Sequence, residues 1–385
     1  MNVFHPQMIQ ELFHDFPLSI VLGVLAGAFL LTFYLIPKIL WVIKEKNLLK
    51  PVIDRSAHSV ETPSFGGVAF FMTLVLVISM FQSFQMEPVG NHFIAGLTIL
   101  FMVGIKDDLV VSTARAKLLG QLIAIFFIIF SPELAVTNLH GFLGFYHIPI
   151  GVGYLISTAF MILIINGYNL IDGINGLAGI IGIIICASFG LYFYLLGSLF
   201  YIFLCVTVIG ILLAFLRYNL SRGKNKIFMG DSGSLIIGFI IGFLALKVLT
   251  MPTQPFLHIN GFIPANRVPF VLAILFVPLF DTFRVIYLRI ANGRSPMQAG
   301  QDHSHHLLLQ CGMSHVQASI LLGAINIGVI ALFIWLLQVL NNSVILFACT
   351  IGIFLLFFFI FQVLAKIGVE RIPSFKEAKT SSLRR

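Results

Sequence analysis

The segment Asn166-Gly-Tyr-Asn-Leu-Ile-Asp-Gly-Ile-Asn-Gly-Leu177 ends an apolar run that begins near residue 151. Asn166, Asn169 and Asp172 recur at every third position, which places two amides and a carboxylate on one face of a helix. The glycines after Asp172 favour a turn where that helix ends. Because ionisable groups beside lipid are costly, the segment is a functional-site candidate. The alternative is a polar cap between two spans.

Composition predicts an all-α polytopic integral membrane protein. Of 385 residues, 59% are hydrophobic and 10% are charged, and the mean hydropathy is +1.02; a soluble domain of this size does not have this composition. Residues 1–367 form one multi-span domain, followed by a basic tail at 368–385. We expect about eleven transmembrane helices, with ten as the alternative count. The predicted spans are 18–43, 66–84, 92–106, 117–131, 150–169, 177–195, 199–217, 232–250, 268–290, 316–340 and 343–367.

The charge pattern predicts an orientation. Lys and Arg fall almost wholly on alternate loops and on the C-terminal tail, while the opposite loops offer only Lys247 and Arg267. The positive-inside rule then places the N-terminus outside and the C-terminus in the cytoplasm, which requires an odd number of spans. The first 17 residues contain no Lys or Arg, so the basic region of a signal peptide is missing. We expect the first span to be retained.

The distribution of the basic residues also limits which classes of partner are expected. They are spread over short loops without an aromatic-interleaved patch, so the pI near 9.4 does not indicate nucleic acid. Anionic lipid headgroups and phosphorylated substrates are the expected partners. The four cysteines show no metal-ligand spacing and are expected to be free thiols.

Two more polar clusters flank early spans. The first cytoplasmic loop contains His58 and Thr62-Pro63 before Gly66-Gly67, which would admit a ligand or a neighbouring helix closely. The third span ends in Asp107-Asp108, and Lys117 opens the next span. Adjacent carboxylates repel, so one could accept a proton, or both could stay ionised beside a metal or the lysine. A solvated helix end is the alternative.

A third cluster, Gly230-Asp231-Ser-Gly-Ser234, opens the eighth span. Backbone N–H groups and hydroxyls at a helix N-terminus suit phosphate, and the carboxylate could hold Mg²⁺ against it. Asp and Ser are also common helix caps, which is the alternative.

A fourth cluster combines cations and histidines on the fifth cytoplasmic loop. Asp281, Arg284, Arg289 and Arg294 precede Asp302-His303-Ser-His305-His306. The histidine spacing does not match zinc motifs, and beside arginines it suits an anionic ligand better. In the predicted topology every cluster lies on the cytoplasmic face, whereas a transporter would place polar groups near the bilayer midplane.

Together these motifs resemble the polyprenyl-phosphate N-acetylhexosamine-1-phosphate transferases, a family of integral membrane enzymes, over about residues 20–365. The resemblance rests on the first-loop residues, Asp107-Asp108, the Asn166–Gly173 segment, Gly230-Asp231-Ser-Gly, and the Asp281–His306 region. It implies transfer of a sugar 1-phosphate, most simply GlcNAc-1-phosphate, from a UDP-sugar to undecaprenyl phosphate. The products would be undecaprenyl-diphosphate-sugar and UMP, at the cytoplasmic face of a bacterial inner membrane. A homodimer is compatible with this assignment.

The resemblance also implies roles for individual residues. Mg²⁺, with Mn²⁺ as a substitute, would be held by Asp231 with Asn169 beside it. The acidic pair Asp107-Asp108 would deprotonate or position the acceptor phosphate. A covalent aspartyl intermediate is the alternative mechanism. The implied catalytic residues are Asp107, Asp108, Asp172 and Asp231, and the implied substrate-binding residues are Lys117, Asn166, Asn169, Arg294, His303, His305 and His306.

Two positions depart from the family pattern. Asn175 stands where many bacterial relatives have Asp, which leaves its role open. The sequence His-Ser-His-His resembles the teichoic-acid and common-antigen starters more than the phospho-N-acetylmuramoyl-pentapeptide branch, which favours a plain N-acetylhexosamine donor. Another UDP-linked N-acetylated sugar, or phospho-N-acetylmuramoyl-pentapeptide, is the alternative donor. A transporter or flippase for polyprenyl-linked glycans is the alternative from another class.

Overall fold

The computed structural model describes residues 6–46, 62–82, 89–110, 112–129, 131–221, 223, 225–252, 262–295, 300, 302–340 and 342–371. These residues form helices and connecting turns, with no β-strand among them. His58 of the first-loop motif, and the predicted tail beyond Arg371, lie outside the described residues. The helices are α1 (Pro6–Asp15), α2 (Pro17–Glu45), α3 (Gly66–Gln82), α4 (Gly90–Leu109), α5 (Ala114–Ile129), α6 (Ile150–Ile171), α7 (Leu177–Leu195), α8 (Leu199–Asn219), α9 (Gly230–Thr250), α10 (Arg267–Ile274), α11 (Phe276–Ala291), α12 (Ser304–Gln310), α13 (His315–Val339) and α14 (Ser343–Arg371), with short 3₁₀ turns at Pro132–Leu134 and Pro264–Asn266.

The prediction of an all-α polytopic membrane protein is confirmed. Among the residues that the structure describes, seven helices are long and apolar enough to cross a membrane, or up to eight if a bent pair is one span. Each of the eleven predicted spans coincides with one helix or with that bent pair. The total of eleven and the orientation of the termini remain predictions.

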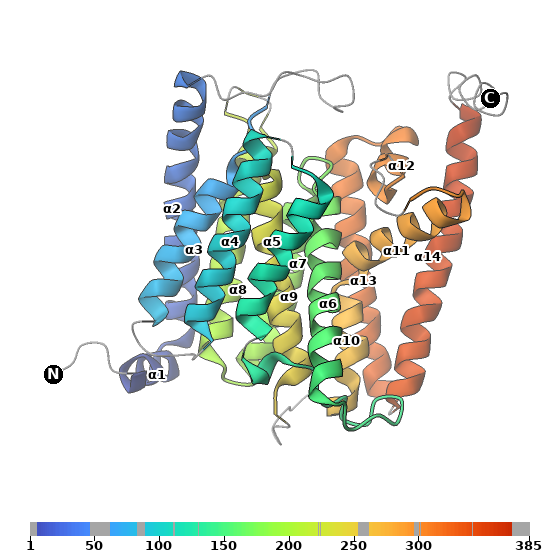
Figure 1. The fold of residues 1–385 in the computed structure, drawn as a ribbon, viewed down its shortest axis with the longest axis horizontal. Coiled ribbons are helices and arrows are strands. Elements are labelled where there is room, and N and C mark those ends of the chain that lie inside the picture. The colour runs from blue at the N-terminus through green and yellow to red at the C-terminus, as the bar shows by residue number, and fades with distance from the viewer. Residues whose placement is uncertain are drawn as a thin grey trace.

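One predicted span differs from the structure. The stretch 268–290, expected as a continuous helix, is broken after Ile274 into α10 and α11, which meet at 71°. The backbone of Leu275 leaves the helical region at this break. As a result α11 crosses the upper part of the bundle obliquely, beside the short helix α12 (Figure 1).

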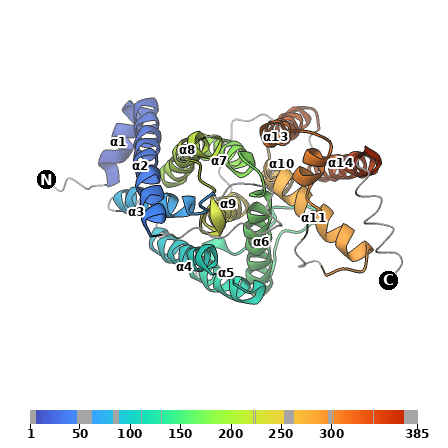
Figure 2. The ribbon, with the colours of Figure 1, turned by 90° about the horizontal axis from the view of Figure 1, so that it is seen from above.

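Helix α9 forms the centre of the bundle. It is apolar around its whole circumference, as expected for a helix buried on all sides. In its most apolar 18-residue stretch, 89% of the residues are buried. Seen from above, α3, α4, α6, α7 and α8 are arranged around it (Figure 2). In contrast, only 17% of the residues in the corresponding stretches of α2 and α14 are buried. Their exposed leucines and phenylalanines therefore form the lipid-facing surface.

Glycines let two neighbouring helices approach the start of α9. A Cβ atom on Gly67 of α3 would lie 2.2 Å from the backbone nitrogen of Gly233, and one on Gly104 of α4 would lie 2.4 Å from Cα of Ser232. Neither distance is compatible with a side chain. Small residues at helix crossings are the usual means of close packing in membranes. The paired glycines before the second span therefore admit a helix.

The two ends of the bundle differ in charge. The starts of α3, α5 and α9 and the end of α4 lie at one end, and the turn between α5 and α6 lies at the other (Figure 1). At that other end, Lys247 lies 3.8 Å from Glu133 and over the ring of Tyr201. Arg267 contacts His140 and the carbonyl oxygens of Met251 and Pro252. Both basic residues predicted for the outer loops are therefore engaged within the protein.

The orientation predicts the accessibility of introduced cysteines. Tyr146, between α5 and α6, and Arg294, just after α11, are exposed. The α5–α6 turn and the end of α11 lie toward opposite ends of the bundle (Figure 1). A membrane-impermeant maleimide added to intact cells should label Tyr146→Cys and not Arg294→Cys, and both should react after permeabilisation. The parent protein, with four free cysteines, measures the background. Labelling of residue 294 alone in intact cells would reverse the orientation.

Close packing at α9 predicts a stability difference between two glycines. Gly104→Ala should lower the free energy of unfolding by about 1–3 kcal/mol, because the added methyl group overlaps the α9 backbone. Gly27→Ala on α2 is the matched control, since its Cβ would meet nothing within 4 Å. Apparent melting temperatures of the purified variants compare the two. Equal melting temperatures would show that α4 shifts freely.

Candidate active site

The polypeptide segments before α3 and α9 run beside each other and position the start of α9. Phe228 N donates to the Pro63 carbonyl at 2.8 Å, Gly66 N donates to the Phe228 carbonyl at 3.0 Å, and Gly67 N donates to the Met229 carbonyl at 3.0 Å. Gly230 follows with φ +73°, a conformation that favours glycine. These bonds turn the chain sharply, so that Asp231 is the second residue of α9.

Asp108 caps the start of α9 from the end of α4. Its Oδ1 accepts from Asp231 N at 2.8 Å, and its Oδ2 accepts from Ser232 N at 3.0 Å and Ser232 Oγ at 2.6 Å. A carboxylate at a helix N-terminus satisfies unpaired N–H groups and complements the helix dipole. Asp108 is only 5% exposed. Its two oxygens therefore anchor α9.

Asp231 is held by groups from two other helices. Lys117 of α5 donates to its Oδ2 at 2.7 Å, and Asn169 of α6 donates to its Oδ1 at 2.7 Å. The same lysine lies 2.8 Å from Asp107 Oδ2, while Asp107 Oδ1 accepts from Ser112 N at 2.6 Å. The two adjacent aspartates thus have separate partners. Asp107 pairs with the lysine, and Asp108 pairs with the backbone of α9.

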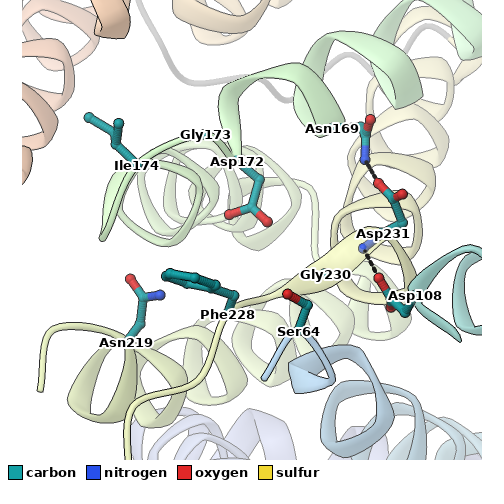
Figure 3. A pocket seen from close by; sticks show the side chains of 10 residues that line it. All are labelled: Ser64, Asp108, Asn169, Asp172, Gly173, Ile174, Asn219, Phe228, Gly230 and Asp231. Carbon is teal, nitrogen blue, oxygen red and sulfur yellow. Dashed lines mark hydrogen bonds between the residues drawn. The ribbon is translucent and has the colours of Figure 1, made fainter. Parts of the chain in front are cut away.

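A cavity of about 300 Å³ opens beside this cluster. Asp172, at the end of α6, points into it across from Asp231 (Figure 3). Burial raises the pKa of Asp172 well above its usual value, and the nearby carboxylates of Asp231 and Asp108 raise it further. The lining residues are Ser64, Asp108, Asn169, Asp172, Gly173, Ile174, Asn219, Phe228, Gly230 and Asp231.

Several lining residues were not predicted from the sequence. Asn219 ends α8, where its Oδ1 accepts from Gly176 N at 2.7 Å and its Nδ2 donates to the Ile227 carbonyl at 3.0 Å. An amide at the end of an apolar span is the same signal that identified Asn169, so Asn219 could have been found. Phe228 and Ser64 carry no such signal. They reach the cavity only because their two segments pair.

The histidine cluster adjoins the cavity. His303 Nδ1 lies 2.6 Å from Asp281 Oδ2, and Ser304 N donates to Asp281 Oδ1 at 2.6 Å. Asp281 on α11 therefore holds the start of α12. The rings of His305 and His306 have centroids 4.3 Å apart.

His305 connects this cluster to the cavity. A Cβ atom on Gly173 would lie 2.3 Å from His305 Nε2, so the ring presses against the turn after Asp172. Burial lowers the pKa of His305 to about 3, and the ring is neutral at pH 7. Its Nε2 is buried without a hydrogen-bond partner. The histidine is therefore placed to support the turn that carries Asp172.

Seven predicted site residues are not among those that line the cavity: Asp107, Lys117, Asn166, Arg294, His303, His305 and His306. Asp107 and Lys117 contact Asp231 or its partners and the histidines adjoin the cavity, whereas Asn166 and Arg294 lie apart. Asn166 binds Gln121 of α5 and the Ile162 carbonyl of its own helix, because its side chain lies one turn deeper than Asn169. Arg294 is exposed beyond the end of α11, and its backbone N–H donates to the Arg289 carbonyl. Asn175 contacts Ser319 through its backbone carbonyl. The side chains of Asn166 and Arg294 therefore do not line the cavity, and their predicted roles in substrate binding stay predictions; the role of Asn175 stays open.

The carboxylates at the cavity are too few to hold a metal ion by themselves, but they could hold one together with the phosphates of a bound substrate. Among the described residues no group of three or more His, Cys, Asp or Glu is arranged to hold a metal ion. The cavity nevertheless presents the carboxylates of Asp231 and Asp172, and Mg²⁺ is commonly held by one or two carboxylates plus substrate phosphates and water. Asn169 turns its amide nitrogen, not its oxygen, toward Asp231. The residues therefore fit Mg²⁺ in that mode, with Asn169 orienting Asp231.

The different partners of the acidic pair predict different stabilities. Asp108→Asn should lower the free energy of unfolding by about 1.5–3 kcal/mol, because an amide NH₂ would face the α9 N–H groups. Asp107→Asn should have a smaller effect, since Asp107 is not among the groups that cap α9. Melting temperatures of the two purified variants test this. A larger loss for Asp107→Asn would contradict the assignment of Asp108 as the anchor.

Comparison with known proteins identifies the family. The glycosyl transferase family 4 model matches residues 91–249. A decaprenyl-phosphate N-acetylglucosaminephosphotransferase of Mycolicibacterium smegmatis is 32% identical over 305 residues, covering 72% of each chain. The undecaprenyl-phosphate alpha-N-acetylglucosaminyl 1-phosphate transferase of Escherichia coli K12 is 25% identical over 285 residues, covering 73% of this chain and 74% of that protein. The chain therefore belongs to the membrane-bound polyprenyl-phosphate N-acetylhexosamine-1-phosphate transferase family, and it is a phosphotransferase.

Proposed function

We propose that the protein transfers a sugar 1-phosphate, most simply GlcNAc-1-phosphate, from a UDP-sugar to undecaprenyl phosphate. The products are undecaprenyl-diphosphate-sugar and UMP. The observation that carries this proposal is the cluster of Lys117, Asp107, Asp231 and Asn169 beside the cavity. It combines a cation for phosphate with carboxylates for a metal and for proton transfer. The names of the relatives support both the sugar and the polyprenyl acceptor.

The cavity suits the nucleotide part of the donor. The ring of Phe228 and the amide of Asn219 face it (Figure 3). An aromatic ring offers a flat face on which a nucleobase can stack. Asp231 and Asp172 line the same cavity at the end where the phosphates would lie. We therefore expect UDP to span the cavity from Phe228 to Asp231.

The residues proposed to hold Mg²⁺, with Mn²⁺ as a substitute, are Asp231 and Asp172. When bound, the ion would offset the negative charge of the donor and stabilise the leaving UMP. Asn169 fixes the rotamer of Asp231 through Oδ1, and Lys117 does so through Oδ2. Lys117 would also neutralise charge where two anionic reactants meet.

Activation of the acceptor is assigned to Asp107. Both oxygens of Asp108 are used by α9, whereas Asp107 faces Lys117 at the edge of the cluster. A carboxylate in this position can accept a proton from the acceptor phosphate while the lysine holds that phosphate. Attack of the phosphate oxygen on the β-phosphorus would then release UMP.

The membrane setting fits this reaction. The acceptor phosphate is confined to the headgroup region, and the donor is soluble and anionic, so both meet at one interface. The charge pattern supports a position of that interface on the cytoplasmic side, and the proposed membrane is a bacterial inner membrane.

Purified protein, undecaprenyl phosphate, Mg²⁺ and a panel of UDP-sugars test the proposal. UMP and lipid product should form with UDP-GlcNAc, and chelation of the metal should stop both. Another UDP-N-acetylated sugar giving the faster turnover would change the donor and keep the reaction. Movement of a polyprenyl-linked glycan without UMP release would favour a transporter.

Asp231→Asn should lower kcat by roughly a thousandfold or more, because several kcal/mol of transition-state stabilisation is lost. Asp15→Asn on α1 is the matched control, since that carboxylate is exposed and paired only with its neighbour His14 at 3.3 Å. It should keep wild-type turnover. Near-normal UMP release by Asp231→Asn would remove Asp231 from the mechanism.

A further inference from the structure

A reciprocal amide pair joins α5 to α6 beneath the active site. Gln121 Nε2 donates to Asn166 Oδ1 at 3.2 Å, and Asn166 Nδ2 donates to Gln121 Oε1 at 2.9 Å. The second amide hydrogen of Asn166 goes to the Ile162 carbonyl at 2.8 Å. Gln121 is 1% exposed. Both hydrogens of the Asn166 amide are therefore engaged within the bundle.

The pair lies one helical turn below the groups that hold Asp231. Gln121 follows Lys117 by four residues on α5, and Asn166 precedes Asn169 by three residues on α6, so each pair shares a helix face. Lys117 and Asn169 donate hydrogen bonds to different oxygens of the Asp231 carboxylate, each at 2.7 Å. The rotation and height of α5 relative to α6 thus decide whether both can reach Asp231.

We propose that Gln121 is a positioning residue, which acts with Asn166 to hold Lys117 and Asn169 in register on Asp231. This inference rests on the proposed function for the effect on turnover. Two antiparallel hydrogen bonds between amides are directional, and sliding one helix past the other breaks both. An apolar contact at the same place would allow small shifts. Misplacement of a catalytic group by about 1 Å can cost roughly a hundredfold in rate.

Steady-state kinetics test the effect on turnover. Gln121→Met keeps the size of the side chain and removes the hydrogen bonds; it should lower kcat about ten- to a hundredfold. The KM for the UDP-sugar should change less than kcat does, because no residue of α5 lines the cavity and Lys117 is proposed to hold the acceptor phosphate. The exchange Gln121→Asn with Asn166→Gln keeps the combined length and should recover most of the lost kcat.

A matched control separates positioning from general stability. Thr32 of α2 and Thr73 of α3 share a buried hydrogen bond of 3.0 Å away from the site. The double variant Thr32→Val, Thr73→Val also removes a polar contact between two helices. It should lower the melting temperature without lowering kcat per folded protein.

The position of Lys117 can also be measured without turnover. In the wild type its ammonium is held between Asp107 and Asp231, so a small amine-reactive reagent should modify it slowly. Gln121→Met should increase that rate several-fold, as mass spectrometry of the Lys117 peptide would show. Unchanged Lys117 reactivity, or unchanged kcat in an active enzyme, overturns the inference. If the wild type releases no UMP from any UDP-sugar, the proposed function fails and Lys117 reactivity alone decides the inference.

Discussion

A carboxylate at the start of the most buried helix is the constraint on which the site depends. Asp231 opens α9, the centre of the bundle, and an uncompensated charge there would be costly. Compensation comes from Lys117, from the Asn169 amide and from the positive end of the α9 dipole. Each of these groups lies on a different helix. The site is therefore complete only when these helices have packed together.

The same constraint explains why two adjacent aspartates differ. Asp107 and Asp108 share the end of α4, yet successive helical positions point about 100° apart, so only one can face the start of α9. Gly104, one turn earlier, brings α4 close enough for Asp108 to reach the α9 N–H groups. Asp107 is then directed to Lys117. Two identical side chains therefore have different partners because they point in different directions from the same helix.

The sequence predicted the parts of the fold that depend on local pattern. Each of the eleven predicted apolar runs is helical, although α1 and α12 were not predicted. Polar residues at the ends of the runs located Asp107, Lys117, Asn169 and Asp231, which the structure brings together. The break after Ile274 interrupts an apolar stretch, so composition gave no sign of it. Asn166 and Asn169 share a helix face, yet one binds Gln121 and the other Asp231. Their depth against neighbouring helices is a tertiary property that spacing does not encode.

The distribution of cations explains why an anionic reaction is confined to one end of the bundle. At the far end, Lys247 lies near Glu133 and over Tyr201, and Arg267 is 3% exposed and bonded to backbone carbonyls. These two charges close the turns at that end. At the other end, Lys117 shares its charge between two carboxylates and remains beside an open cavity. An incoming phosphate can compete with the two carboxylates for that ammonium. A carboxylate that loses its contact with the lysine could instead bind a divalent ion that enters with the phosphate. The excess of carboxylates around one lysine is therefore consistent with the proposal that a divalent ion enters with the phosphates.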